Sequence, residues 1–387
     1  MENVLLLFGG MSYEHDISIV TASQIFNKTK SEKFKLIPVY ISRENKFFVY
    51  LEKGFNLKDF SKNSVFKPGK KFKEVVFVSS EKNTLFQKTM FGLKEFLYVK
   101  NAIVACHGGS GENGELVAFL EGLNIKCSSG SVDALGVCMN KFLFKQVMKG
   151  IGVPVVAGFK LNRNDFDGEE FKRKLFLRMR FLSFPLILKP NKGGSSIGLF
   201  VAKNNQDFNK KLEECFEFDD DVVIEKFVQN AREFNVAVVG TKEEFEVSEI
   251  DEPLKLNDVL SFKDKYLSGA KTKKTSASNS MASQARKFPA EISDELRNQI
   301  RAIASKIFKE LDLSGIVRID FLFDENNNKL FVCEVNSVPG SLAYYFFAKN
   351  KITTNWLIEK LINISDKNFA NKTKFNSDFV TNVLEGE

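Results

Sequence analysis

Hydrophobic runs that end in glycine or histidine loops alternate with helix-like segments in the first third of the chain. Each run is almost continuously apolar, which is typical of a strand buried on both faces of a parallel sheet. The runs are residues 3–8, 34–41 and 101–106, and helical spacing follows in residues 19–26 and 115–122. This alternation predicts a small doubly wound α/β domain over residues 1–130. Within it, residues 43–90 carry Phe-rich and Lys-rich runs that predict hairpins or irregular structure.

The pattern changes after residue 130, where mixed helices and strands predict two α+β units. The first covers residues 131–221, with helices expected at 132–149 and 169–179 and strands at 155–160, 184–190 and 199–202. The second covers residues 222–365, with strands expected at 222–228, 232–239 and 244–250, a helix at 293–311, a hairpin at 315–336 and a helix at 354–364. A polar tail is expected over residues 366–387.

The hairpin at 315–336 carries four polar side chains on otherwise apolar strands. Side chains alternate across a strand, so Arg318 and Asp320 share one face of the first strand. Glu334 and Asn336 likewise share one face of the second. If the hairpin is symmetric about residue 327, Asp320 lies opposite Glu334, and two facing carboxylates repel each other. Carboxylates and a carboxamide are oxygen ligands that Mg²⁺ takes alongside substrate phosphates, so the pattern favours a metal site over a solvated sheet edge.

A glycine-rich stretch at 191–198 is the second chemical signal. Its backbone N–H groups can cradle phosphate oxygens, and Ser195 and Ser196 add hydroxyl donors. A P-loop would need a helix directly after the glycines, whereas a strand is expected here. We therefore predict a glycine hairpin that folds over a nucleotide, with an ordinary tight hairpin as the alternative.

The loop at 107–114 has a different character. Its glycines match the G-x-G-x-x-G pattern of dinucleotide-binding folds, with Asp133 about twenty residues further on. Glu112 lies inside this loop, where its charge would oppose a pyrophosphate, so we rank an NAD-binding interpretation last. A structural role is the simpler interpretation of His107 on pattern alone.

The net charge of +7 does not predict nucleic-acid binding, because it is concentrated in one segment. Residues 263–287 contain seven basic side chains and one acidic side chain. A nucleic-acid binder spreads its Lys and Arg over a face, whereas this segment is also rich in Ser, Thr, Ala and Gly. It predicts a lid-like loop over residues 262–289.

Length and composition indicate a globular protein of the cytoplasm. A chain of 387 residues with 43% hydrophobic content predicts two or three domains. The five cysteines are isolated from one another, which fits free thiols in a reducing compartment. The N-terminal apolar run is too short for a signal peptide, and no stretch reaches membrane-spanning length. Neither export nor membrane insertion is expected.

Seven motifs, taken in order, resemble the D-alanine–D-alanine ligase family of the ATP-grasp superfamily. They lie at residues 9–14, 107–114, 189–198, 225–226, 265–268, 318–320 and 334–340. Each motif alone is weak, but the ordered set spans most of the chain and is specific. The resemblance implies an ATP-grasp fold, α/β and α+β, in which the N-terminal domain binds substrate and the two later units enclose the nucleotide.

The resemblance also implies a reaction: ATP-dependent ligation of two D-alanine molecules to D-alanyl-D-alanine, a peptidoglycan precursor, through an acyl phosphate. It assigns Glu14 to the ammonium group of the first substrate, in a hydrogen-bonded set with Ser195 and Tyr266. It assigns Arg318 to the oxyanion of the tetrahedral intermediate, a role that a fixed cation serves well. It further implies a homodimer formed through the first domain.

Other contacts are likewise implied by the resemblance. Two Mg²⁺ ions (or Mn²⁺) would be held by Asp320, Glu334 and Asn336. The implied ATP contacts are Lys141, Lys189, Ser195, Ser196, Glu225, Lys226, Glu233 and Lys265. The implied substrate contacts are Glu14, His107, Gly340, Ser341 and Tyr345.

The chain departs from the family pattern at a few positions. Asn113 and Asn140 stand where the family usually has Asp. Tyr345 stands where the family commonly has a serine that binds the carboxylate of the second substrate, which leaves the selectivity of the second subsite open. The pair at 265–266 resembles dipeptide-forming members, and it favours D-alanyl-D-alanine over D-alanyl-D-lactate as the product.

Two other functions stay open on the sequence. Another ATP-grasp carboxylate–amine ligase, or a D-alanine–D-lactate ligase, would keep the ATP chemistry and change the second substrate. A nucleotide-binding regulatory protein would keep the fold without turnover. The chain keeps the complete set of candidate reactive residues, which argues against a loss of catalysis. They are Glu14, Arg318, Asp320, Glu334 and Asn336.

Overall fold

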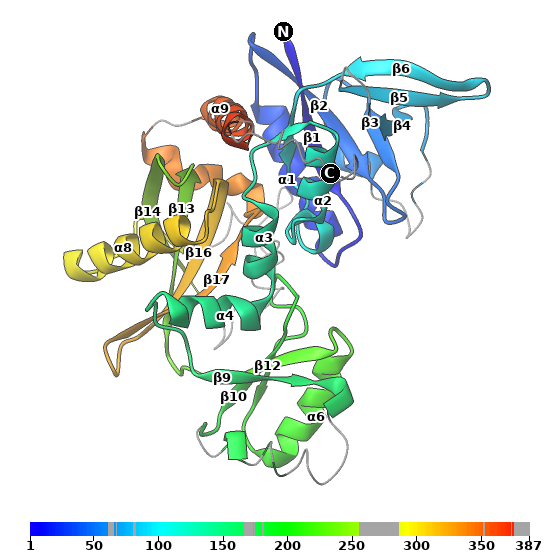
Figure 1. The fold of residues 1–387 in the computed structure, drawn as a ribbon. Helices are drawn as coiled ribbons and strands as arrows, with labels where there is room; N and C mark the ends of the chain where they lie inside the picture. The colour runs from blue at the N-terminus through cyan, green and yellow to red at the C-terminus, as the bar shows by residue number, and fades with distance from the viewer. Residues whose placement is uncertain are drawn as a thin grey trace, which may run out of the picture.

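The chain folds around three sheets (Figure 1). The computed structural model describes residues 1–60, 66, 68–79, 83–165, 173, 175, 177–179, 182–254, 286–350, 353–372 and 374. Most of the predicted lid, including Lys265 and Tyr266, lies outside these residues, as does most of the helix expected at 169–179. None of the helices in the described ranges combines the length and the apolar character that a membrane crossing requires.

The N-terminal sheet is half parallel and half antiparallel, with strand order β6-β5-β4-β3-β2-β1-β7-β8. The parallel strands are β1 (Glu2–Gly9), β2 (Phe34–Ile41), β7 (Asn101–Val104) and β8 (Lys126–Cys127). The antiparallel strands are β3 (Phe47–Tyr50), β4 (Phe72–Val78), β5 (Thr84–Thr89) and β6 (Gly92–Tyr98). The strands predicted as parallel at residues 3–8, 34–41 and 101–106 are confirmed as β1, β2 and β7, and hairpins extend the same sheet.

The antiparallel half explains the Phe-rich residues 43–90. They form hairpins, as predicted, and these hairpins extend the same sheet because β3 pairs with β2 through Val39 and Val49. The ring centroids of Phe60 and Phe66, in the connection between β3 and β4, lie 5.3 and 4.5 Å from that of Tyr40, within the range of favourable aromatic pairs. Aromatic packing thus adds to the backbone pairing at this junction.

The parallel half positions the chemistry of the first domain. Helix α1 (His15–Lys28) connects β1 to β2, and α2 (Glu115–Gly122) connects β7 to β8. Because β1 and β7 are adjacent and parallel, their carboxyl ends meet at the same sheet edge, where ligands bind in such folds. The loops that carry Glu14 and His107 therefore lie side by side.

The single helix expected over residues 132–149 is two helices, α3 (Val132–Met139) and α4 (Lys141–Gly150). Asn140 separates them with an extended backbone, and its side-chain oxygen accepts a hydrogen bond from the Leu143 N–H at 2.9 Å. Asparagine is a strong N-cap residue. The break places Lys141 at the first position of α4, where its backbone N–H donates to the Asn191 carbonyl at 3.0 Å.

The central unit is a four-stranded antiparallel sheet of order β11-β10-β12-β9. Its strands are β9 (Gly158–Asn162), β10 (Leu186–Pro190), β11 (Phe200–Ala202) and β12 (Asp221–Lys226), and α6 (Asn205–Phe216) packs on it. The glycine-rich stretch joins β10 to β11, so it is a hairpin between strands, as predicted.

The five-stranded sheet is antiparallel and has the order β15-β14-β13-β16-β17. Its strands are β13 (Arg232–Gly240), β14 (Phe245–Pro253), β15 (Arg286–Lys287), β16 (Gly315–Asp324) and β17 (Lys329–Asn336). Helix α8 (Asp294–Glu310) covers this sheet. As predicted, Ser293 caps the helix: its hydroxyl accepts a hydrogen bond from the Leu296 N–H at 3.2 Å.

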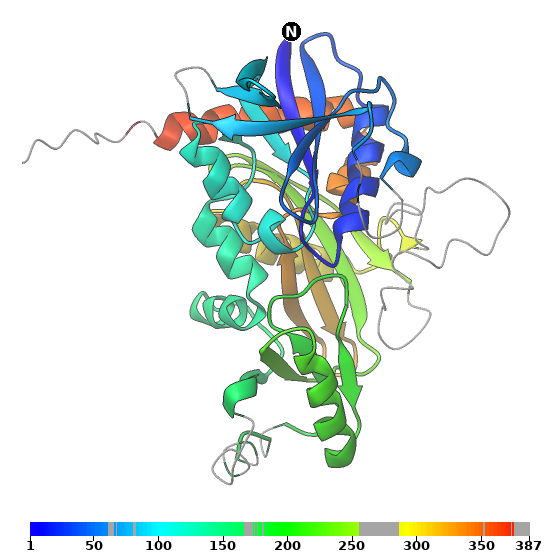
Figure 2. The ribbon, with the colours of Figure 1, turned by 90° about the vertical axis from the view of Figure 1, so that its right-hand side faces the viewer.

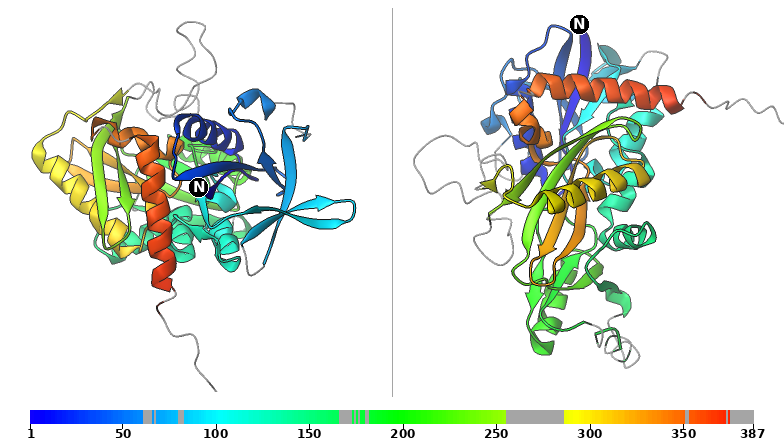
Figure 3. Two further views of the ribbon diagram at one scale, coloured as in Figure 1. Left: turned by 90° about the horizontal axis from the view of Figure 1, so that it is seen from above. Right: turned by 90° about the vertical axis from the view of Figure 1, so that its left-hand side faces the viewer.

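The C-terminal segment ties the first and third units together. The 3₁₀ segment η6 (Gly340–Asn350) packs against α1 and β14, and α9 (Thr354–Lys372) packs against β7, β8 and β16. Figure 2 and the left view of Figure 3 show α9 beside the N-terminal sheet, with the five-stranded sheet on its other side. Helix α9 continues past residue 365, so the first residues of the expected tail are helical.

We predict that Asn140→Ala destabilises the protein by about 1 kcal/mol, because the first turn of α4 loses its capping acceptor. Asn140→Asp should keep that acceptor and add a favourable charge at the helix N-terminus. The measurement is the free energy of urea unfolding for both variants. Equal stability of the alanine variant and the wild type would contradict the capping role.

Candidate active site

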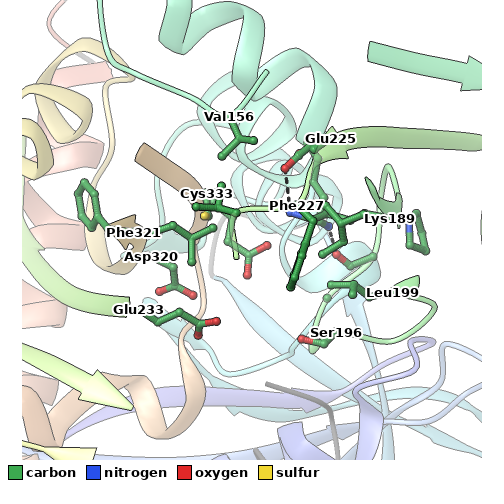
Figure 4. A pocket seen from close by; sticks show the side chains of 18 of the residues that line it. Val156, Lys189, Ser196, Leu199, Glu225, Phe227, Glu233, Asp320, Phe321 and Cys333 are labelled. Atoms are coloured by element: carbon green, nitrogen blue, oxygen red, sulfur yellow. Dashed lines mark hydrogen bonds and ion pairs between the residues drawn. The ribbon is translucent and has the colours of Figure 1, made fainter. Parts of the chain in front are cut away.

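A pocket of about 980 Å³, open to solvent at its mouth, lies between the four-stranded and five-stranded sheets (Figure 4). Apolar walls come from Val156, Leu199, Phe227 and Phe321. The pocket also brings together the predicted nucleotide and metal residues Lys141, Lys189, Ser196, Glu225, Lys226, Glu233, Asp320 and Glu334.

Glu225 is buried at one end of this pocket between two lysines. Its carboxylate oxygens lie 3.0 Å from Lys145 Nζ and 3.0 Å from Lys189 Nζ. Burial alone would raise the pKa of Glu225, but the two ammonium groups outweigh it and lower the pKa to about 2. A carboxylate oxygen can accept more than one hydrogen bond, so the ionised Glu225 can also accept from an amino group such as that of adenine.

Lys141 reaches the glycine-rich hairpin from the start of α4. Its ammonium group donates to the Gly193 carbonyl oxygen, and burial lowers its pKa. Two serines of this hairpin have a strained backbone: the φ angles of Ser195 and Ser196 are +52° and +59°, in the left-handed region. Such conformations are costly for residues other than glycine and concentrate at functional sites.

The register of β16 and β17 confirms the symmetric hairpin at its functional end. Asp320 pairs with Glu334, and Arg318 pairs with Asn336. A bulge directly after Asp320 shifts the remaining pairs by one residue, so Phe321 lies opposite Val332. The two carboxylates therefore face each other across neighbouring strands, as predicted.

Three donors surround Asp320 and offset this repulsion. Arg318 holds it in a bidentate pair, with Nε to Oδ1 and Nη2 to Oδ2 both at 2.7 Å. The Asn336 amide donates to Oδ2 at 3.0 Å. The Asn235 amide, oriented with its nitrogen toward Asp320, donates to Oδ1 at 3.1 Å. Charge-assisted hydrogen bonds of this kind are among the stronger ones in proteins.

The donor set fits a divalent cation that arrives with phosphates. Mg²⁺ is usually bound by one or two carboxylates together with substrate phosphates and water. Over the described ranges, no group of three or more His, Cys, Asp or Glu side chains is arranged to hold a metal ion. Asp320, Glu334 and the carboxamide of Asn336 can thus supply part of a coordination shell, and a nucleotide would have to supply the rest.

A second cavity, of about 350 Å³, lies at the junction of the three units. It is lined by Glu14, His107, Glu112, Ser195, Arg318, Glu334, Asn336, Val338, Pro339 and Gly340. We call it the inner cavity. Seven of these residues are candidate site residues from the sequence, contributed by segments more than 300 positions apart.

Glu14 and Ser195 close the inner cavity from two sides. The Ser195 hydroxyl donates to Glu14 Oε1, joining the glycine-rich hairpin to the start of α1. The approach requires glycine, because a Cβ at Gly194 would lie 2.2 Å from Glu14 Oε2. Two of the three residues of the predicted hydrogen-bonded set therefore meet, and the third, Tyr266, lies outside the described residues.

His107 is buried beside α1. Its Nε2 lies 2.8 Å from the Thr21 hydroxyl, and burial lowers its pKa to about 4. The imidazole is therefore neutral at physiological pH and contributes hydrogen bonding without charge to the wall of the inner cavity.

Glu112 is a site residue that the sequence-based candidate set omits. It accepts hydrogen bonds from the backbone N–H groups of Gly108 at 2.9 Å and Val338 at 3.0 Å. Burial and then the charge of Glu14 raise its pKa to about 8. A signal was present in the sequence, since a glutamate inside a glycine loop after a buried strand is unsuited to a pyrophosphate site and needs another role.

The three predicted substrate contacts within residues 340–345 separate in the structure. Gly340 lines the inner cavity. Ser341 is turned toward α1, where its hydroxyl donates to Gln24 Oε1 at 2.6 Å and its backbone N–H to the Thr21 hydroxyl at 3.1 Å. Tyr345 lies under the guanidinium group of Arg286, 4.6 Å from the ring centroid.

Comparison with known proteins gives an assignment that agrees with this geometry. The family model described as D-ala D-ala ligase N-terminus matches residues 3–130, and the model described as D-ala D-ala ligase C-terminus matches residues 147–364. The chain belongs to the D-alanine–D-alanine ligase family. A D-alanine–D-alanine ligase of Thermosipho melanesiensis is 34% identical to it over 389 residues, which cover 100% of this chain and 99% of the relative.

Solved structures of D-alanine–D-alanine ligases share the fold. The enzyme of Helicobacter pylori superposes with a TM-score of 0.70 at 26% identity, covering 94% of this chain and 98% of the other. The enzyme of Coxiella burnetii superposes with a TM-score of 0.75 at 23% identity, covering 96% of each chain. The ATP-grasp fold that the motifs predict is thereby confirmed.

We predict that Glu112→Gln removes a pH dependence of stability. Because burial holds the pKa of Glu112 near 8, against an ordinary 4.5, the folded state binds a proton that the unfolded state has lost between these values. The contribution of Glu112 to the stability of the wild type should thus fall as pH rises from 5 to 8. Thermal unfolding at both pH values is the measurement. The glutamine variant should lose less, and an equal loss would contradict the assignment.

Proposed function

We propose that this member of the D-alanine–D-alanine ligase family uses ATP to join two D-alanine molecules into D-alanyl-D-alanine, a peptidoglycan precursor, in the cytoplasm. The observation that carries the proposal is the inner cavity, which brings Glu14, Ser195, Arg318 and Glu334 together. These residues offer a carboxylate for the ammonium group of a small amino acid beside the phosphate end of the nucleotide pocket.

The nucleotide would lie in the larger pocket between the two sheets. Apolar side chains sandwich the base, and Glu225 accepts a hydrogen bond from the adenine amino group. Glu233, which lines the same pocket, accepts from the ribose. Lys141, Lys189 and the hydroxyl of Ser196 face the phosphates, together with Lys226 at the pocket wall and Lys265 from the lid. When bound, two Mg²⁺ or Mn²⁺ ions on Asp320, Glu334 and Asn336 would neutralise phosphate charge.

The first D-alanine would bind in the inner cavity with its ammonium group on Glu14. The contact between Glu14 and Ser195 holds that carboxylate in place, and Tyr266 completes the set when the lid covers the site. The substrate carboxylate then points at the γ-phosphate, and transfer gives an acyl phosphate. Closure excludes water, which protects this intermediate from hydrolysis.

The amine of the second D-alanine then attacks the acyl carbon, and phosphate leaves. Arg318 is pre-oriented for the developing oxyanion, because Asp320 already fixes the plane of its guanidinium group. The backbone N–H of Gly340 and the neutral His107 border the same cavity and can position the reacting groups.

Inorganic phosphate and ADP release from ATP should depend on both D-alanine and Mg²⁺, and should stop on addition of EDTA. Glu334→Gln should lower this rate by at least about 100-fold, since even groups that only support metal ligands account for 10- to 100-fold. Asp324→Asn, at the far end of the same hairpin, serves as the matched control and should keep the rate. Turnover of Glu334→Gln at the wild-type rate would rule out the metal assignment.

The same assay separates the remaining alternatives. A ligase with another acceptor would release phosphate faster with a second D-amino acid or with D-lactate than with D-alanine alone. A regulatory protein would bind ATP and release no phosphate with any of them.

We also propose that the chain forms a homodimer through its first domain. Strand β6 is the edge of the N-terminal sheet, and the turn that precedes it exposes Met90 and Phe91 at 92% and 94%. An open edge strand with apolar side chains at its tip is a template for pairing with another chain, and two-fold dimers are the commonest assemblies.

Lysine at both positions, Met90→Lys with Phe91→Lys, should convert the dimer to a monomer in light-scattering chromatography. The reason is that charge at the tip makes burial of this surface unfavourable. Leu143→Lys, a comparably polar change on exposed α4, is the control and should leave the mass unchanged. A wild-type monomer, or a dimer that survives the double change, would contradict the proposal.

A further inference from the structure

A row of polar side chains crosses one face of the five-stranded sheet. Glu334 lies opposite Asp320, Asp320 opposite Asn235, and Asn235 opposite Asp251. Directly opposed residues share a face. At the end of the row Asp251 forms an ion pair with Arg286 of β15 at 3.1 Å. The row therefore runs from the metal-binding residues to a cation at the far edge of the sheet.

Arg286 is held in a defined position. The Asp251 side chain that pairs with it is only 3% exposed, and the Arg286 side chain is 13% exposed. The guanidinium group also lies over the ring of Tyr345, 4.6 Å from its centroid. An ion pair and a cation–π contact on one guanidinium group make it a fixed charge rather than a mobile one.

Arg286 and Tyr345 lie outside the nucleotide pocket and beside the segment that leads away from the inner cavity. Neither residue is among those that line either of the two pockets. Tyr345 belongs to η6, the segment that begins at Gly340 of the inner cavity. Burial raises the pKa of Tyr345 while the charges of Arg286 and then Arg318 lower it, so both guanidinium groups lie near its hydroxyl.

The second substrate brings a carboxylate into this enclosed region, and an enclosed anion needs a cationic partner. Lys141 and Lys189 line the nucleotide pocket, and the proposed function already assigns Arg318 to the oxyanion. The hydroxyl of Ser341 is directed at Gln24. A guanidinium group has five N–H donors, so Arg286 can serve Asp251 and a second carboxylate together.

We propose that Arg286 binds the carboxylate of the second D-alanine, and that Asp251 and Tyr345 are positioning residues that hold its guanidinium group. The proposal rests on the proposed function, because it assumes an amino acid acceptor. The proposal gives Tyr345 a role, because the face of its ring supports Arg286, which would bind the carboxylate of the second D-alanine.

The test compares Arg286→Gln with Arg232→Gln. Arg232 is a matched control: it pairs with Glu252 at 2.8 and 2.9 Å and lies 5.0 Å over the ring of Phe234. Glu252 follows Asp251 directly, so its side chain lies on the other face of the sheet. ADP release is measured against D-alanine concentration and fitted for the first and second substrate separately.

Arg286→Gln should raise the KM of the second D-alanine by about 10-fold or more, the effect of losing a hydrogen bond between charged groups. The KM values of the first D-alanine and of ATP should stay within about twofold. As a second readout, D-alanine and D-alaninamide compete as acceptors, and mass spectrometry quantifies the two dipeptide products. The wild type and Arg232→Gln should prefer D-alanine, and Arg286→Gln should lose that preference.

An unchanged second KM and an unchanged preference in Arg286→Gln would overturn the proposal, as would an equal rise of all three KM values. Arg286→Lys keeps the charge without the planar fork; it should give an intermediate second KM and carries the test if the glutamine variant does not fold. A wild type that releases no ADP with D-alanine would refute the proposed function and this inference together. An active wild type with an unaffected Arg286→Gln would refute the inference alone.

Discussion

The repulsion between Asp320 and Glu334 is the constraint around which the catalytic end of the structure is built. Two carboxylates on facing positions of β16 and β17 are unfavourable unless a cation or several donors lie beside them. Arg318, Asn336 and Asn235 supply those donors. On the proposed function, binding of a metal nucleotide has to exchange some of these contacts for ion coordination, so the same oxygens serve stability and catalysis in turn.

Charge compensation of this kind recurs throughout the interior. Glu225 is ionised because Lys145 and Lys189 enclose it, and Glu112 keeps its proton because burial and Glu14 oppose a second charge. Two buried carboxyl groups thus have opposite protonation, and the sign depends on their neighbours. The first suits recognition of a neutral amino group, and the second places a neutral carboxyl group beside Glu14 in the inner cavity.

The strongest predictions from the sequence concerned local geometry. Alternation along two short strands placed Asp320 opposite Glu334, and a cap residue correctly began α8 at Ser293. The prediction of one helix over residues 132–149 was wrong, because the capping strength of Asn140 outweighed continuous helical spacing. The hairpins expected within residues 43–90 were confirmed, but the sequence did not show that strands β3 to β6 continue the parallel sheet, because their pairing with β2 depends on contacts outside any periodic pattern.

By itself, the sequence determined most of the elements, the hairpin register at residues 318–320 and 334–336, and the family, because these follow from periodicity and from ordered motifs within short stretches. Only the tertiary structure decided which charges meet. Four features join segments that are distant in the sequence. They are the contact of Glu14 with Ser195, the burial of Glu112, the turn of Ser341 toward Gln24, and the pairing of Arg286 with Asp251 and Tyr345. Protonation, side-chain direction and cation placement depend on neighbours brought close by packing, and no local pattern encodes those distances.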